Sequence, residues 1–289
     1  MTYRDALSQK PKPSAGLTRQ ELWLLLGAAA LLAAAVFGPV WLDSSHQHGF
    51  ADQRVLWGIP CAGDVLSNLP FALAGLWGLA ALRRVAPGGL DGCSRVLAVL
   101  FFAGLVATAV GSTAYHWQPQ DAGLLWDRLG MVLPFAGLLG LAANGRVSRR
   151  AGWGAAGAVL VAGPLAVWWW ARSGNVMPWA VVQLGGMVVV AALALLPRRQ
   201  GALAVHLGAV IAMYALAKLF EAADHAVLDA TAQWVSGHSL KHVLAAGAAW
   251  PVLLALAALR RSVAKGALRV TPSGQNGAHT VGVARQLRA

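Results

Sequence analysis

Long apolar stretches alternate with short polar segments along most of this chain. Each apolar stretch has about the ~20 residues that an α-helix needs to cross a bilayer, and charged or turn-forming residues separate one stretch from the next. The pattern therefore predicts transmembrane helices. The eight predicted helices cover residues 22–41, 64–82, 95–116, 124–143, 151–171, 177–196, 203–223 and 239–259.

The composition agrees with this pattern, since 57% of the 289 residues are hydrophobic and only 12% are charged. We predict an all-α polytopic membrane protein. A secretory signal peptide is the alternative for the first helix, but its polar leader is long and FGPVWLDSS offers no A-x-A cleavage site. The predicted divisions are a cytoplasmic tail at 1–20, an N-terminal transmembrane helix at 21–42, a seven-helix core at 60–260 and a flexible cytoplasmic tail at 262–289.

Basic residues collect in alternate loops of this predicted topology. By this count 18 of the 23 Lys and Arg residues fall on one side, and 8 of the 11 Asp and Glu residues fall on or near the other. The positive-inside rule then places both termini in the cytoplasm, and we expect a bacterial inner (plasma) membrane. The net charge of +12 follows from this orientation and calls for no nucleic-acid partner. Cys61 and Cys93 fall on opposite sides, so no disulfide is expected between them.

Three histidines are predicted to meet on the extracytoplasmic side. His116 ends one predicted helix, Asp127 begins the next, and His238 and His242 begin the last. Ser112 and His116 are four residues apart, as are His238 and His242, so each pair shares one face of its helix. Isolated histidines of this kind are commonly structural hydrogen-bond partners, but three together with polar neighbours predict a metal site.

Several other polar residues are not assigned to the metal site. We expect His46 and His206 to be structural hydrogen-bond partners. In KLFEAADH, the side chains of Lys218, Glu221 and His225 lie roughly on one helix face. They could form an ion-pair brace or part of a pocket.

Four sequence blocks resemble those of a known family. GDVLSNL, GSTAYHWQPQ, LLWDRLGM and SGHSLKH look like signature blocks of the alkaline ceramidases, within the CREST superfamily that also contains the adiponectin-receptor-like proteins. The resemblance covers roughly residues 60–260 and leaves the first helix as an N-terminal addition. It implies a seven-helix core that begins outside and ends in the cytoplasm. An additional first helix with a cytoplasmic N-terminus preserves that orientation.

The resemblance implies an intramembrane zinc amidohydrolase that cleaves a ceramide-like or other lipid amide to a fatty acid and an amine. It assigns zinc to His116, His238 and His242, a proton shuttle to Asp127 and hydrogen bonding of the developing oxyanion to Ser112. Three neutral imidazoles leave zinc a fourth position for water, whose pKa can fall to about 7. The expected partner is a membrane lipid substrate, and the oligomeric state stays open.

The chain departs from this family in one region, and other functions stay open. Animal alkaline ceramidases carry an acidic calcium-binding cluster before the first core helix, whereas FADQRVLWGIPCAGD offers only Asp52 and Asp64. Calcium dependence is therefore not expected, and ceramide itself stays one option among lipid amides. The alternatives are a non-catalytic receptor or sensor with a structural zinc and a haem-binding membrane cytochrome. A transporter would be expected to show repeat symmetry or broken midplane helices, and neither is evident.

Overall fold

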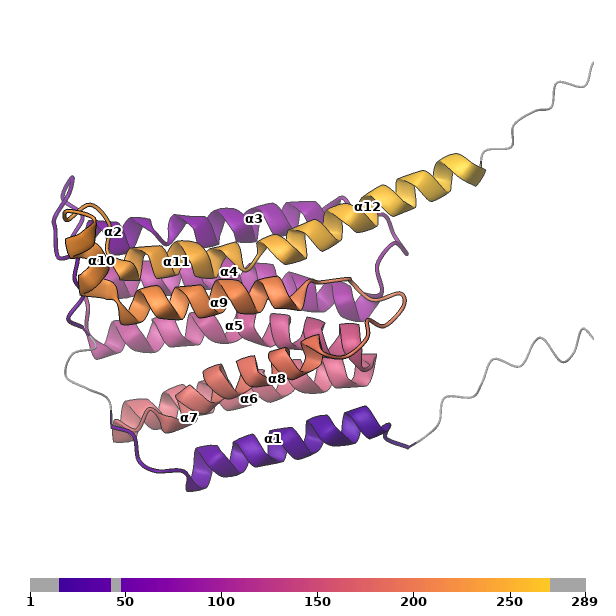
Figure 1. The fold of residues 1–289 in the computed structure, drawn as a ribbon, viewed down its shortest axis with the longest axis horizontal. Helices are drawn as coiled ribbons and strands as arrows, with labels where there is room; N and C mark the ends of the chain where they lie inside the picture. The colour runs from indigo at the N-terminus through magenta and orange to yellow at the C-terminus, as the bar shows by residue number, and fades with distance from the viewer. Residues whose placement is uncertain (1–15, 43–47, 271–289) are drawn as a thin grey trace, which may run out of the picture.

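Antiparallel helices lie side by side in a bundle (Figure 1). The computed structural model describes residues 16–42 and 48–270, and for 262–270 it describes the backbone alone. Within this part the chain forms helices and no strand, and seven segments are long and apolar enough to cross a membrane. The prediction of an all-α polytopic membrane protein is confirmed. The seven segments are Arg19–Phe37, Ala62–Arg83, Gly92–Trp117, Asp121–Arg146, Arg149–Ser173, Met177–Ala194 and Gly237–Arg261.

Several of these segments consist of more than one helix. The single helices are α1 (Arg19–Phe37), α4 (Gly92–Trp117), α5 (Asp121–Arg146) and α6 (Arg149–Ser173). The composite segments join α2 (Ala62–Leu66) to α3 (Leu69–Arg83), α7 (Met177–Ala180) through the π-helix η1 (Val181–Gly185) to α8 (Gly186–Ala194), and α11 (Gly237–Gly247) to α12 (Trp250–Val270). The shorter α9 (Leu207–Ala222) and α10 (Asp224–Ala230) precede α11.

The predicted helix at 203–223 is the one that differs most from the structure. The observed α9 begins at Leu207 and has 16 residues, so it is not among the seven segments long enough to cross a membrane. Its N-cap is His206, whose Nδ1 accepts a hydrogen bond from Ala209 N at 3.1 Å. The helix still packs against α11 inside the bundle (Figure 1).

Polar side chains fix where several helices begin. Asp91 accepts a hydrogen bond from Ser94 N at the start of α4, Ser148 accepts one from Ala151 N at the start of α6, and Ser236 caps α11 in the same way. Such caps satisfy backbone N–H groups that have no partner within the helix. The cap at Ser236 sets the first turn of α11, which carries His238.

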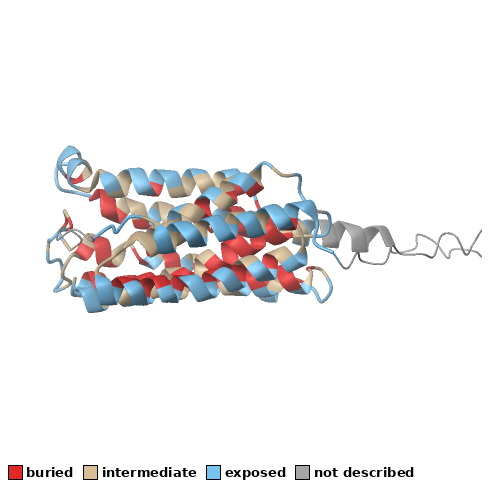
Figure 2. Ribbon diagram, turned by 90° about the horizontal axis from the view of Figure 1, so that it is seen from below, coloured by how far each residue is buried: buried red, intermediate tan, exposed pale blue. Residues whose placement is uncertain are grey.

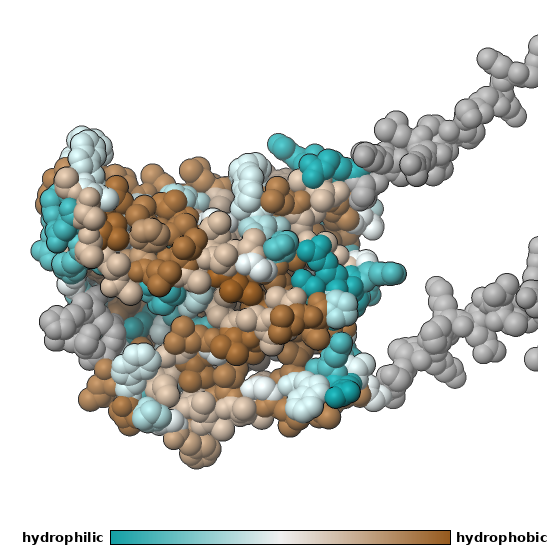
Figure 3. All heavy atoms as spheres, viewed as in Figure 1, coloured by the Kyte–Doolittle hydropathy of each residue, from teal (hydrophilic) through white to brown (hydrophobic). Residues whose placement is uncertain are grey.

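The buried and exposed surfaces fit a bilayer environment. Buried residues line the interior of the bundle (Figure 2), while large apolar side chains such as Leu73, Val110 and Leu219 are exposed on its outside. In Figure 3 apolar residues dominate the flanks, and hydrophilic residues gather toward the two ends. An apolar belt of this kind is suited to contact with lipid, and the chain is an integral membrane protein.

Glycines bring α4 and α5 into close contact. A Cβ at Gly104 would lie 2.3 Å from Pro134 N, and one at Gly111 would lie 2.6 Å from the carbonyl oxygen of Trp126. Small residues allow helix backbones to approach in membranes, where packing is the main driving force for helix association. The contact at Gly111 places α4 directly against the residue that precedes Asp127.

The first helix packs on the periphery of the bundle. Helix α1 contacts α7 and η1, and its buried Glu21 accepts hydrogen bonds from Ser148 Oγ at 2.6 Å and Arg150 Nη2 at 3.2 Å. Helix α1 begins, and α12 ends, at the same end of the bundle (Figure 1). The opposite end carries the three histidines.

Candidate functional site

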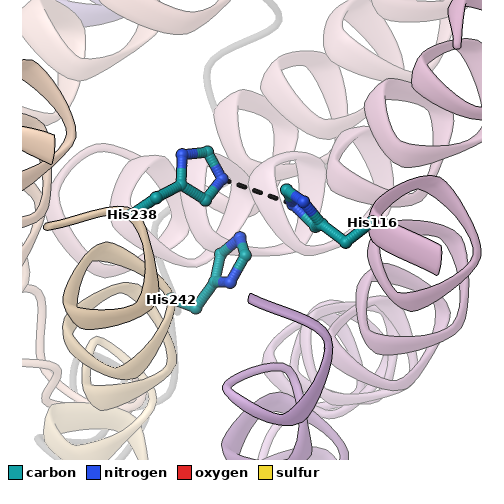
Figure 4. A group of neighbouring side chains, drawn as sticks. All are labelled: His116, His238 and His242. Carbon is teal, nitrogen blue, oxygen red and sulfur yellow. Dashed lines mark hydrogen bonds between the residues drawn. The ribbon is translucent and has the colours of Figure 1, made fainter. Parts of the chain in front are cut away.

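His116, His238 and His242 meet at one end of the bundle. His116 lies in the last turn of α4, and the other two lie on the first two turns of α11. All three are buried, and each offers a ring nitrogen within 4.8 Å of the others. The rings face a common space (Figure 4). Among the described residues this is the only group of three His, Cys, Asp or Glu side chains that could hold a metal ion.

The spacing of one pair of these nitrogens matches that of two ligands on a small tetrahedral ion. His116 Nε2 and His238 Nε2 are 3.3 Å apart. Two imidazole ligands at the usual zinc–nitrogen distance of about 2.0–2.1 Å on a tetrahedral ion would be about 3.3–3.4 Å apart. The ring centroids lie 4.8 to 5.0 Å from one another. The three-histidine group therefore fits a metal ion such as zinc.

Neighbouring groups select the available nitrogen of His242. The Ser67 hydroxyl donates to the Asp64 carbonyl oxygen at 3.0 Å, and Ser67 Oγ also lies 2.8 Å from His242 Nδ1. Because the hydroxyl proton is already used, Ser67 accepts from His242 Nδ1–H, and the lone pair of this imidazole is on Nε2. A hydrogen bond to the second nitrogen is the usual way of orienting a metal-ligating histidine.

Ser112 and Asp127 lie together beside this group. Ser112, one turn before His116 on α4, is hydrogen-bonded to the Asp127 side chain on α5. Both are buried. The neighbouring Arg128 places its guanidinium over the ring of Trp170, 4.0 Å from the ring centroid, and its charge also acts on Asp127. Two of the sequence blocks thus meet at the α4–α5 contact.

Lys241 is a site residue that the sequence interpretation did not single out. Its Nζ lies 3.1 Å from His238 Nε2 and 2.9 Å from Glu221 Oε1. Glu221 also pairs with Lys218 one turn earlier on α9. The sequence SGHSLKH could have indicated this contact, because a residue three positions after His238 lies on the same helix face. His225 lies on α10, is exposed and takes no part in this chain of charges.

The segment before α2 covers the three-histidine group. The ring of Phe50 lies 4.5 Å from the rings of both His116 and His238, measured between centroids. His48 hydrogen-bonds through Nδ1 to Tyr115 Oη at 2.9 Å and through Nε2 to Asp121 Oδ1 at 3.0 Å. These contacts hold the segment over the site. His46 lies outside the described residues.

An ion pair fixes the same segment to the loop before α11. Arg54 hydrogen-bonds both carboxylate oxygens of Asp52 at 2.7 Å, and it also donates to the carbonyl oxygens of Gln233 and Trp234. Burial acts to raise the pKa of Asp52, but the hydrogen bonds and charge of Arg54 outweigh it, so this pKa lies below its usual value. Arg54 is thus the cation that pairs with the Asp52 carboxylate.

Asp64 serves the first turn of α11. Its Oδ1 accepts hydrogen bonds from Ser236 Oγ at 3.0 Å and from Ser239 Oγ at 2.7 Å. Asp224 acts similarly, since its two oxygens accept from the backbone N–H groups of His238 at 2.7 Å and Ala51 at 2.9 Å. Both carboxylates therefore position the helix that carries two of the three histidines.

An apolar groove of about 410 Å³ lies between α3 and α4 near this end of the bundle. Asn68 contributes the main polar group in its lining. Its Nδ2 donates to the Asp64 carbonyl oxygen at 2.9 Å, while its buried Oδ1 has no hydrogen-bond partner. The remaining lining residues are Leu69, Ala72, Val106, Ala109, Val110, Thr113, Ala114 and Trp117.

No family model matches this chain, and no curated protein matches it in sequence. Its function is therefore inferred from the chemistry of the site and from the sequence blocks described above.

Proposed function

We propose that this protein is an intramembrane zinc-dependent amidohydrolase that cleaves a ceramide-like or other lipid amide to a fatty acid and an amine. The observation that carries the proposal is a buried group of three imidazoles with a carboxylate beside it and no fourth His, Cys, Asp or Glu ligand among the described residues. Structural zinc sites have four protein ligands, whereas catalytic sites have three and leave one position open.

His116, His238 and His242 would hold the ion, which when bound supplies a Lewis acid for the amide carbonyl and lowers the pKa of water. Asp127 would take a proton from the attacking water and return it to the nitrogen as the carbon–nitrogen bond breaks. Ser112, hydrogen-bonded to Asp127, would hold this carboxylate in position. A hydrogen bond from Ser112 to the developing oxyanion stays a prediction.

The surroundings of the site favour a lipid substrate. The histidines lie near the ends of membrane-spanning helices, and Trp117, which directly follows His116, lines the apolar α3–α4 groove. An acyl chain fits the chemistry of this groove, because its lining is almost entirely apolar. The three rings contact one another, which leaves no room for a porphyrin between them and disfavours the cytochrome.

Zinc analysis combined with mass spectrometry of fatty acid release tests this function. The purified protein would be incubated with membrane lipid extract and with defined N-acyl sphingosines. In Asp127→Asn we expect zinc to be retained while hydrolysis falls by roughly 10²–10⁴-fold, the usual range for general acid–base catalysis. The matched control is Asp229→Asn, an exposed aspartate of α10 whose side chain contacts Gln233, and it should hydrolyse at a rate near wild type.

Two outcomes would contradict the proposal in different ways. Wild-type turnover in Asp127→Asn would disprove the proton shuttle. Stoichiometric zinc without hydrolysis of any lipid amide would instead favour a receptor or sensor with a structural metal.

A further inference from the structure

Lys241 is a charged side chain that the proposed reaction does not use. Only 21% of its side chain is exposed, compared with 43% for Lys218 on the outer side of the same ion-pair chain. Ionisable residues at membrane depth are costly, and they are usually retained for a functional reason. Glu221 lies between the two lysines and accepts from both.

The ammonium group of Lys241 lies directly against the three-histidine group. Its Nζ is 3.1 Å from His238 Nε2, the same atom that lies 3.3 Å from His116 Nε2. Asp127 also interacts electrostatically with Lys241. Lys241 therefore borders the three-histidine group at His238 and is close enough to Asp127 to interact with its charge.

Charge balance indicates what this ammonium group would bind. Glu221 is shared between Lys218 and Lys241, and a divalent cation held by the histidines would add positive charge beside Lys241 Nζ. Lys241 would also have to give up its contact with His238 Nε2, because that lone pair would bind the metal. The Lys241 ammonium group and the cation would then repel each other unless an anion lies between them.

We propose that Lys241, held by Glu221, is an anion-binding residue of this site, and that its ligands are the fatty acid carboxylate and the negatively charged oxygen that develops on the amide carbonyl. This inference rests on the proposed function for the identity of the ligand. Ser112 hydrogen-bonds Asp127, so Lys241 supplies a donor for the oxyanion that does not compete with the proton shuttle. Charge-assisted hydrogen bonds of this kind are among the strongest in proteins.

Equilibrium binding of radiolabelled palmitate to the zinc-loaded, detergent-purified protein tests the inference. Hexadecanol, which has the same chain length but no charge, serves as the neutral competitor. We expect wild type to prefer palmitate over hexadecanol. In Lys241→Met, palmitate affinity should fall about 10–100-fold while hexadecanol affinity is unchanged, as expected when one hydrogen bond to a charged group is lost. Lys241→Arg should retain the preference.

Lys218→Met is the matched control, because this lysine pairs with the same glutamate but is more exposed than Lys241. It should bind palmitate like wild type. The inference is overturned if Lys241→Met retains both zinc and full palmitate affinity, or if Lys218→Met loses as much. If Lys241→Met does not fold, the wild-type protein alone tests the inference. Equal affinity of wild type for palmitate and hexadecanol would overturn the inference. Lys241-dependent palmitate binding without hydrolysis would defeat the proposed function alone.

Discussion

At the scale of single residues, the orientation of each imidazole depends on its neighbours. Ser67 directs His242, and Phe50 packs on the other two rings. Such supporting contacts fix the ring positions before a metal binds, and they limit the solvent that reaches the site. Truncation of a histidine should therefore affect metal binding more than it affects the fold.

His242→Ala should remove the metal. Wild type is expected to hold about one zinc per chain, and the variant should hold almost none, because two imidazoles alone bind zinc weakly. Inductively coupled plasma mass spectrometry of purified protein measures this. His206→Ala is the control, since His206 is exposed and caps α9 far from the site. Equal zinc content in both variants would contradict the assignment.

The sequence was sufficient to predict the convergence of His116, His238 and His242, because helix spacing and topology placed all three at one end of the bundle. It did not identify Phe50 or Lys241 as neighbours of the site. Phe50 belongs to a segment without periodic structure, where spacing carries no information about direction. Lys241 contacts His238 through a rotamer of a long side chain, which a pattern of helix positions does not specify.

At the scale of helices, the contact between α4 and α5 positions Ser112 beside Asp127. Their backbones approach closely because Gly104 and Gly111 have no Cβ. The sequence predicted both helices, but the depth of their contact depends on how the glycines face Pro134 and Trp126 after folding. The shortened α9 and the π-helix η1 were likewise not predicted, because apolar stretches do not reveal where packing interrupts a regular helix.

Gly111→Ala should separate α4 from α5. The new Cβ would lie 2.6 Å from the Trp126 carbonyl oxygen, and relief of this clash should cost about 1–3 kcal/mol of stability, as overpacking usually does. Hydrolysis should fall with it, since Asp127 follows Trp126 directly. Thermal unfolding in detergent measures the stability. Gly27→Ala, where nothing lies within 4 Å, should be neutral or slightly stabilising. A fully stable and active Gly111→Ala would refute the role of this contact.

At the scale of the whole molecule, α1 begins and α12 ends at one end of the bundle, and the histidines lie at the other. The distribution of basic residues predicts that the end where α1 begins and α12 ends faces the cytoplasm. The resemblance to a seven-helix core predicts the same orientation, with α1 as the addition that returns the N-terminus to that side. Its peripheral packing on α7 and η1 is compatible with an added helix.

Cysteine labelling measures this orientation. In a background with Cys61 and Cys93 replaced by serine, a membrane-impermeant maleimide should label Gln120→Cys in intact cells. It should label Arg84→Cys only after the membrane is opened, because Arg84 lies at the opposite end of the bundle, between α3 and α4. Both positions are exposed. The reverse pattern would place the site on the cytoplasmic side.

The separation of the three histidines along the chain affects when the candidate site can form. His238 is 122 residues after His116, and at a synthesis rate of about 5–20 residues per second the ribosome needs roughly 6–24 s to cover that distance. During this interval α4 and α5 can pair and bring Ser112 to Asp127, but His238 and His242 have not yet been synthesised. The three histidines can thus meet only after α11 is inserted, so a chain arrested before α11 would carry the Ser112–Asp127 contact without the three-histidine group.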